Sequence, residues 1–265
     1  MMPRGAPIAT LALLALAACS PQEFVWDDIG PAQLQHYRAA FQTAAGRSVV
    51  ADLSRDELVR HLRQQRLLWL GDHHRSRRLH ALQRELLDQL QAAGVRLAFA
   101  LEAIGSQDEP AVQRFLRGAA SLRQLRAEMQ TRWPGSWLDD EQLDTGHYRA
   151  LLTFARQHGI PVVALEPTPR LPIEQRDAAM VASVRTAGDR WPDRLLVVLV
   201  GQLHLVGVGD VVARTGRGGL VFGAEPPPQL VGAAPVPTLP GAVYQSNGGL
   251  WWFGELAPAT DPPLQ

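Results

Sequence analysis

Cysteine is almost absent from the chain: a single one, Cys19, occurs among the 265 residues. With no second thiol, a disulfide within the chain is excluded. Because Cys19 lies in an N-terminal segment with the features of an export signal, described below, we also exclude a cysteine nucleophile.

An excess of charge of either sign is lacking as well. Lys and Arg together number 26, and so do Asp and Glu, so the formal net charge is zero. Such a chain has no net positive field that would gather nucleic acid or anionic lipid. We therefore expect no nucleic-acid partner, and membrane attachment requires a feature other than charge.

Several common enzyme motifs are also missing from the sequence. It contains no Gly-x-Ser-x-Gly, no phosphate-binding loop and no His-Glu-x-x-His, and Gly207-x-Gly209 lacks the third glycine of a dinucleotide fingerprint. These absences disfavour serine hydrolases of the nucleophile-elbow type, nucleotide hydrolases, zinc peptidases with that motif and dinucleotide-dependent enzymes.

The N-terminus has the features of a lipoprotein signal peptide. Arg4 precedes an apolar run over 8–18 that is too short to cross a bilayer as a helix. The run ends in Leu-Ala-Ala before Cys19, which resembles the lipobox in which the thiol is acylated before cleavage. We expect export and lipid anchoring through Cys19 in the bacterial cell envelope, and Ser20 is compatible with sorting to the outer membrane. The alternative is a secreted protein in which Cys19 is incidental.

Hydrophobic periodicity predicts an α/β fold with a mainly parallel β-sheet flanked by helices. Apolar runs without polar alternation are typical of buried parallel strands, and each is followed by a helical pattern. The predicted strands are 67–70, 95–101, 161–165, 195–200, 220–222 and a last one around 251–253. The predicted helices are 54–65, 76–93, 109–130, 148–158 and 172–187.

The sequence predicts one folded domain behind an exported N-terminus. We expect a signal peptide over 1–18, a lipidated N-terminus and linker over 19–52, and an α/β domain over 53–265. The linker is expected to include a short helical segment, with Trp26, Tyr37 and Phe41 available to pack on the domain. Within this domain, 106–147 is expected to form a small inserted helical subdomain, because its second half is rich in Trp, Gly and Asp and lacks sustained periodicity.

Carboxylates and imidazoles follow four of the predicted strands. Asp72 and His74 follow the first, Glu102 the second, Glu166 the third and His204 the fourth. The carboxyl ends of parallel strands lie at one edge of the sheet, where α/β proteins place ligands. We therefore predict a site at this edge, with Asp72, His74, Glu102 and His204 as its catalytic candidates.

Two of these segments share the spacing Gly-x-x-His, at 71–74 and 201–204. A glycine at each strand end is expected to allow a sharp turn that brings the histidine back over the edge. Two chemistries fit this residue set and stay open: His74, Glu102 and His204 hold a divalent transition metal, or the histidines act directly as general acid and base. The local alternative is that each side chain caps backbone groups. His80 is expected on an exposed helix face.

The strand-end motifs resemble the ChaN family of haem-binding lipoproteins, in a superfamily that also holds Tiki peptidases and erythromycin esterases. The segments that carry the resemblance, within about 53–215, are LLWLGDHH, LAFALEAI, HYRALLTFARQHGIPVVALEP and VVLVGQLHL. Two departures stand out: Asp72 replaces the usual glutamate of the first motif, and Glu166 stands where many relatives carry an amide.

The resemblance implies haem as the cofactor or ligand, bound through a tyrosine. Tyr148, in the matching HYRALL segment, is the candidate iron ligand, with a half-buried helix tyrosine as the alternative. It implies a membrane-anchored protein of iron acquisition that works with an outer-membrane haem or iron receptor system. Two other hypotheses remain: a metal-dependent or His-assisted hydrolase, and an enzyme relic that acts as an envelope scaffold. The oligomeric state stays open.

Overall fold

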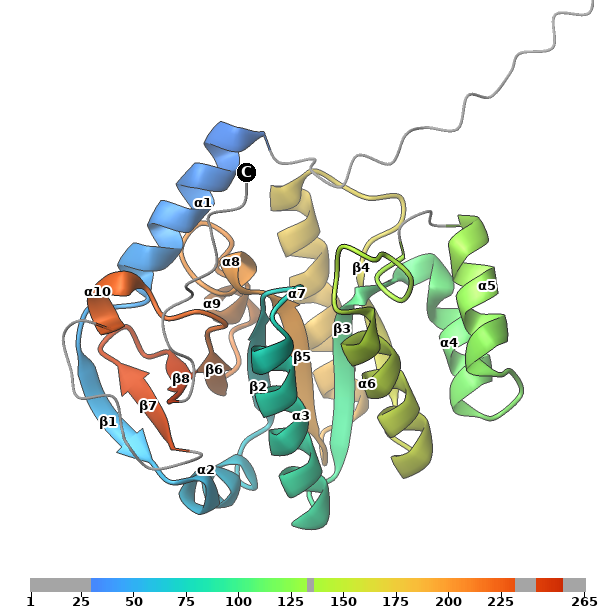
Figure 1. Cartoon of the computed structure of the whole chain (residues 1–265), viewed down its shortest axis with the longest axis horizontal. Coiled ribbons are helices and arrows are strands. Elements are labelled where there is room, and N and C mark those ends of the chain that lie inside the picture. Colours follow the sequence, from blue (N-terminus) through green and yellow to red (C-terminus); the bar gives the residue numbers. More distant parts are fainter. Residues whose placement is uncertain (1–29, 133–135, 232–241, 255–265) are drawn as a thin grey trace, which may run out of the picture.

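The computed structural model describes residues 30–132, 136–231 and 242–254, and these residues form an eight-stranded sheet with the order β1-β7-β8-β6-β2-β5-β3-β4 (Figure 1). The strands are β1 (Val49–Leu53), β2 (Leu67–Asp72), β3 (Leu97–Gly105), β4 (Val162–Glu166), β5 (Leu195–Gly201), β6 (Leu220–Phe222), β7 (Val243–Ser246) and β8 (Trp251–Phe253). All neighbours from β8 to β4 pair in parallel, while β7 is antiparallel to both β1 and β8. The predicted α/β class with a mainly parallel sheet is confirmed.

Helices cover both faces of the sheet. They are α1 (Pro31–Ala44), α2 (Arg55–Leu62), α3 (Arg77–Ala92), α4 (Glu109–Leu116), α5 (Leu122–Arg132), α6 (Thr145–His158), α7 (Ile173–Arg190), α8 (Gln202–Leu205), α9 (Val211–Thr215) and α10 (Pro228–Val231), with a 3-10 turn over Ser106–Asp108. In Figure 1, α3 and α6 lie in front of the central strands and α7 lies behind them.

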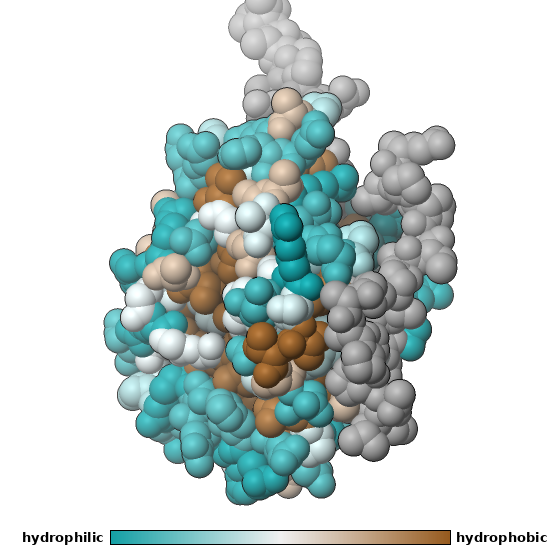
Figure 2. Space-filling model, turned by 90° about the vertical axis from the view of Figure 1, so that its left-hand side faces the viewer, coloured by the Kyte–Doolittle hydropathy of each residue, from teal (hydrophilic) through white to brown (hydrophobic). Residues whose placement is uncertain are grey.

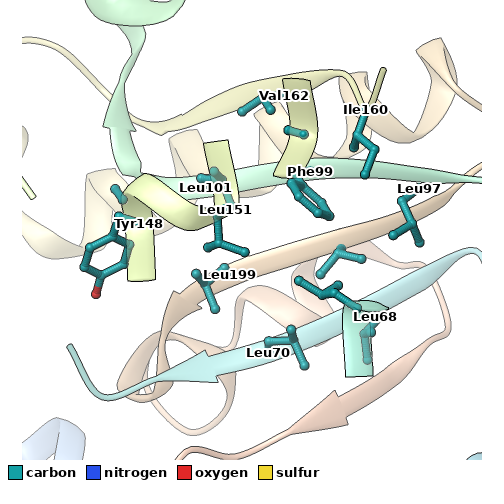
Figure 3. Packing of buried hydrophobic residues seen from close by; sticks show 14 of the residues in the cluster. Leu68, Leu70, Leu97, Phe99, Leu101, Tyr148, Leu151, Ile160, Val162 and Leu199 are labelled. Carbon is teal, nitrogen blue, oxygen red and sulfur yellow. The ribbon is translucent and has the colours of Figure 1, made fainter. Parts of the chain in front are cut away.

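The core is divided into two clusters because strand side chains alternate between the faces. Leu68 and Leu70 of β2 join the cluster that includes α3 and α6, whereas Leu67 and Trp69 join the cluster that includes α1 and α7. Figure 3 shows part of the first cluster, with Tyr148 at its end. Because the central strands are buried on both faces, their sequences lack polar alternation.

Local sequence signals explain most element boundaries. The capping box that begins α2 is present: the Ser54 side chain accepts from the Glu57 backbone and the Glu57 side chain accepts from the Ser54 backbone. The helix predicted over 109–130 is two helices, α4 and α5, separated around Gly118, whose positive φ of 79° does not fit a helix.

The segment expected as a linker with a short helix contains that helix and, in addition, a strand of the sheet. Both α1 and most of β1 lie within 19–52, and β1 pairs with β7 near the C-terminus, which makes it part of the sheet. Periodicity could not reveal this pairing, because the two partners are short and far apart in sequence. The predicted signal peptide and Cys19 lie outside the described residues.

The two outer strands of the sheet differ in how their edges are covered. At β4, Gln113 donates to the Val162 carbonyl and Glu109 accepts from the Ala164 amide, so α4 caps the edge. On β1, the side chain of Val50 is 59% exposed. Figure 2 shows this side of the molecule, where a compact hydrophobic area lies among hydrophilic residues.

Over the described ranges, every helix is too short or too polar to cross a membrane.

Candidate functional site

The polar strand ends meet at the carboxyl edge of the sheet. β2 and β5 are neighbours, and their register pairs Asp72 with Gly201, so the two Gly-x-x-His segments leave the sheet side by side. A methyl group on Gly201 would lie 3.4 Å from Glu102 Oε2, 3.4 Å from His204 Cδ2 and 3.5 Å from His74 Cε1. His74, Glu102 and His204 therefore converge on one point.

The glycines of the two motifs leave space at the strand ends and do not make a sharp turn. Neither Gly71 nor Gly201 has a positive φ. A methyl group on Gly71 would lie 2.8 Å from the Phe222 carbonyl oxygen of the neighbouring strand, closer than side chains approach. At Gly201 the absent side chain leaves the space that the three site residues face, which corrects the expected physical reason for the motif.

Asp72 orients His74 and is itself bound by two further donors. His74 Nδ1 lies 3.1 Å from Asp72 Oδ2, the Tyr148 hydroxyl donates to the same oxygen at 2.7 Å, and His80 Nε2 lies 2.8 Å from Oδ1. Burial alone would raise the pKa of Asp72, but the charges and hydrogen bonds of His74 and His80 hold it well below its usual value. An ionised Asp72 only accepts, so His74 donates from Nδ1 and Nε2 is left free to act.

His204 is held in a similar way by Asp177 of α7. His204 Nδ1 lies 2.5 Å from Asp177 Oδ1, and the Tyr37 hydroxyl of α1 donates to Asp177 Oδ2 at 3.1 Å. The side chain of His204 is only 8% exposed, while that of His74 is 35% exposed. His74 therefore lies at the more exposed side of the site, which we call its mouth, and His204 lies at the buried side, its base.

Glu102 lies between the histidines and is fixed by two donors. Its Oε1 accepts from Arg176 at 3.0 Å, and its Oε2 accepts from the Gly201 amide at 2.6 Å. Burial opposes ionisation, but His204, Arg176 and His74 lower the pKa of Glu102 below its usual value. Arg176 also donates to Glu166 at 2.8 Å. Burial, reinforced by the charge of Glu102, raises the pKa of Glu166.

Trp137 covers part of the mouth. Its ring lies 4.3 Å from the His74 ring and 5.2 Å from the Tyr148 ring, between centroids. The backbone of the same segment is attached to the site, because the Asp144 amide donates to the His74 carbonyl at 2.9 Å. Burial opposes protonation of His74, but the Asp72 carboxylate outweighs it and raises the pKa of His74.

Tyr148, predicted as an iron ligand, is buried beside Asp72. Figure 3 shows its hydroxyl directed away from the labelled leucines, and this hydroxyl donates to Asp72. Burial, followed by the charge of Asp72, raises the pKa of Tyr148 far above its usual value. As an iron ligand, Tyr148 would first have to give up the bond to Asp72.

Several residues of the site were not predicted from the sequence, and the exposed position predicted for His80 was wrong. His80 is fully buried, with Nδ1 2.9 Å from Asp144 and Nε2 2.8 Å from Asp72, and its ring stacks on His147 at 3.9 Å. The prediction failed because the leucines of α3 mark only part of its buried face. His80 and Gln83 belong to that face as well.

Arg176 and Asp177 did carry a signal in the sequence. They occupy the stripe of α7 that also holds Ile173, Met180 and Val184, the spacing of the buried face of a helix. Charged residues at core positions are rare unless they are paired, so their place in this stripe marks a buried charge network.

The geometry does not support the predicted divalent metal site. In the part of the chain that the structure describes, no three His, Cys, Asp or Glu side chains form a group that could hold a metal ion. The atoms that would bind a metal already have other partners. The Glu102 oxygens accept from Arg176 and the Gly201 amide, and Nδ1 of both His74 and His204 faces an aspartate. A cation such as Arg176 beside Glu102 also repels a metal ion.

Residues 58–172 match the model of a family described as haem-binding uptake, Tiki superfamily, ChaN. This match confirms the resemblance predicted from the sequence. The matched range contains His74, Glu102 and Tyr148, while His204 lies beyond it. No curated protein matches the chain.

Solved structures similar to the chain include three bacterial proteins. RRSP, a MARTX toxin effector domain from Vibrio vulnificus CMCP6, is 19% identical with a TM-score of 0.46, over 73% of this chain and 39% of that one. The C-terminal region of Pasteurella multocida toxin, with a thiol-protease like catalytic triad, is 14% identical with a TM-score of 0.41, over 56% and 20%. ChaN of Campylobacter jejuni, solved with cofacial haem binding, is 9% identical with a TM-score of 0.42, over 63% and 86%. The chain spans less than two thirds of the length of the two toxins.

Proposed function

We propose that this protein binds haem at the mouth formed by His74 and Trp137, as a lipid-anchored protein of the bacterial cell envelope that serves iron acquisition. The observation that carries the proposal is the environment of His74: its hydrogen bond, its exposure and its aromatic neighbour. Its Nδ1 faces the Asp72 carboxylate at 3.1 Å, its side chain is 35% exposed, and its ring lies against an indole.

These residues fit the requirements of haem. An imidazole that held haem iron would do so through one ring nitrogen, while the other donates to a carboxylate that fixes the tautomer and strengthens the ligand. Asp72 supplies that carboxylate, so Nε2 of His74 is the nitrogen left for iron. The Trp137 ring supplies an aromatic wall for the macrocycle. The family match over 58–172 supports the choice of haem as ligand.

Hemin titration of purified protein tests the proposal. We expect a saturable Soret shift that His74→Ala abolishes and that His61→Ala leaves unchanged, because His61 is exposed on α2 before the opposite end of β2. Tyr148→Phe tests the ligand predicted from the sequence. Loss of binding in Tyr148→Phe with normal binding in His74→Ala would make the tyrosine the ligand, and no saturable shift at micromolar hemin would contradict haem binding itself.

The anchor and the cellular role need separate experiments. In cells given labelled palmitate, we expect the label on the wild-type protein and none on Cys19→Ser, with the wild type in the outer-membrane fraction. A role in iron acquisition predicts poor growth of a deletion strain on hemin as sole iron source, and a haem receptor of the outer membrane as partner. Growth equal to the parent strain on hemin would contradict that role.

A second candidate function is hydrolysis assisted by histidine, and the convergence around Gly201 favours it. Two imidazoles that each donate to an aspartate present their Nε2 atoms to the same region as the Glu102 carboxylate. One neutral imidazole would take a proton at Nε2 from water as it attacks an acyl carbon, and the other, in its protonated form, would give its Nε2 proton to the leaving group. The carboxylates hold both rings in the required orientation.

His204 separates the two candidates, since it lies at the base of the site. We expect His204→Ala to retain hemin binding through His74 but to abolish any peptidase or esterase activity. A panel of peptide and ester substrates with no turnover above the His204→Ala background would remove hydrolysis from consideration. A parallel loss of hemin binding in His204→Ala would contradict the assignment of haem to the mouth.

A further inference from the structure

All three tyrosines of the chain are buried, and two of them end at the site. Tyr148 of α6 donates to the aspartate that orients His74, and Tyr37 of α1 donates to the aspartate that orients His204. Tyr244 lies in β7, within the hydrophobic cluster behind the sheet. The site thus contains two His–Asp–Tyr units assembled from different elements.

The two units share the same connectivity. In the first, Tyr148 donates to Asp72 at 2.7 Å and His74 Nδ1 lies 3.1 Å from the same carboxylate. In the second, Tyr37 donates to Asp177 at 3.1 Å, and His204 Nδ1 lies 2.5 Å from its other oxygen. The two imidazoles of these units are the ones that converge on Gly201.

A tyrosine hydroxyl has a definite effect on a buried carboxylate. It satisfies a lone pair that has no access to water, and it fixes the rotation of the carboxylate about its last side-chain bond. An ionised carboxylate so fixed accepts from Nδ1–H of the histidine, which leaves the Nε2 lone pair directed toward the site. The hydroxyl thereby selects the reactive nitrogen of a ring that it does not touch.

We propose that Tyr37 and Tyr148 are a matched pair of positioning residues that set the tautomer and orientation of His204 and His74. The segment expected as a linker before the domain therefore contributes to the site, because Tyr37 lies on α1. The inference rests on the proposed site but not on the choice between haem binding and hydrolysis.

The two carboxylates differ in the donors that remain when the tyrosine hydroxyl is removed, and this difference predicts unequal effects. Asp72 keeps His80 as a further donor when the Tyr148 hydroxyl is removed. Among the described residues, the side-chain oxygens of Asp177 have hydrogen bonds only with Tyr37 and His204. Removal of the Tyr37 hydroxyl should therefore disturb its histidine more than removal of the Tyr148 hydroxyl does.

Nitrogen NMR of the full chain, labelled with ¹⁵N-histidine, tests the pair directly. His74 and His204 signals are assigned by their disappearance in His74→Gln and His204→Gln. We expect Tyr37→Phe to shift the His204 ring signals and leave those of His74 in place, and Tyr148→Phe to do the reverse with a smaller shift. Tyr244→Phe, the control for loss of a buried hydroxyl, should move neither.

Each outcome bears on the proposal. Shifts confined to the paired histidine support positioning, and a shift of both histidines in all three variants would contradict it by showing a general structural effect. Unchanged His74 and His204 signals in Tyr37→Phe and Tyr148→Phe would overturn it. Hemin titration of the same samples separates the two proposals, because a protein that binds no hemin can still show the paired shifts.

Discussion

The two ends of the central strands carry charge in different ways. At the carboxyl ends, Arg176, Glu102 and Glu166 are buried, and each is bound by another charged side chain. At the amino ends, Arg96 pairs with Asp193 at the surface, and the Arg96 side chain is 62% exposed. A cavity of about 200 Å³ at the amino ends is lined by Arg63, Arg66 and Arg96, among others.

The difference shows which end of the sheet is built for chemistry. Exposed arginines around a cavity remain hydrated and can pair with any anion, so they impose no geometry. Buried charges must be paired with good geometry, because each would otherwise lose its hydration without compensation. The carboxyl end therefore fixes particular atoms in place, which a binding or catalytic site requires.

Arg176→Met gives the largest expected difference in stability between substitutions at the two ends of the sheet. It leaves Glu102 buried without its arginine and Glu166 with only Arg170, 3.7 Å away, which should lower the free energy of unfolding by about 3–5 kcal/mol. Arg96→Met at the amino end should cost about 0–1 kcal/mol. Urea denaturation at neutral pH measures both, and equal losses would contradict the contrast.

The pH dependence of hemin affinity, set by His74, is the next largest expected effect. The raised pKa of His74 means that protons compete with iron for Nε2, so hemin affinity should rise with pH and level off only above the ordinary histidine value of 6.5. Below that point the affinity should fall by about tenfold per pH unit, as expected when one proton is displaced.

Asp72→Asn provides the matched variant for the pH profile. Without the carboxylate the pKa of His74 falls, so the rise in affinity should move to lower pH, while the maximum affinity drops by about 10–100-fold. Hemin titrations across pH compare the two proteins. A flat profile for the wild type would show that no ionising ligand binds the iron.

Gly201→Ala should have the smallest effect on stability and a clear effect on the site. The added methyl makes ordinary contacts of 3.4–3.5 Å, so the free energy of unfolding should change by about 1 kcal/mol or less. The methyl fills the point where Glu102 and both histidines converge, so, if the protein is a hydrolase, its His204-dependent turnover should be lost. Gly218→Ala, which meets no atom within 4 Å, is the control. Full turnover in Gly201→Ala would contradict the convergence as the reaction point.

The sequence predicted the central sheet well because its strands are buried on both faces. β2, β3, β4 and β5 appear as continuous apolar runs, and the polar residues that follow them mark the carboxyl edge. β1 and β7 were not predicted because they are short and because they pair with each other although they lie far apart in the sequence. Their pairing depends on tertiary structure rather than on local pattern.

Half of the site was open to prediction for the same reason. Glu102 lies near the end of β3, and His74 and His204 come shortly after the ends of β2 and β5. Asp177, Arg176 and Tyr37 instead approach from helices whose orientation a sequence does not specify. The buried charges of α7 were visible as charged residues in an apolar stripe. Tyr37 had no such signal, since an aromatic residue on the buried face of a helix is ordinary core.

Resonance Raman spectroscopy of the haem complex identifies the atom bound to iron and so decides whether His74 is the ligand. We expect an iron–imidazole stretch in the ferrous complex that is absent from His74→Ala and shifted in Asp72→Asn. An iron–phenolate signature in the ferric complex that disappears in Tyr148→Phe would contradict this assignment.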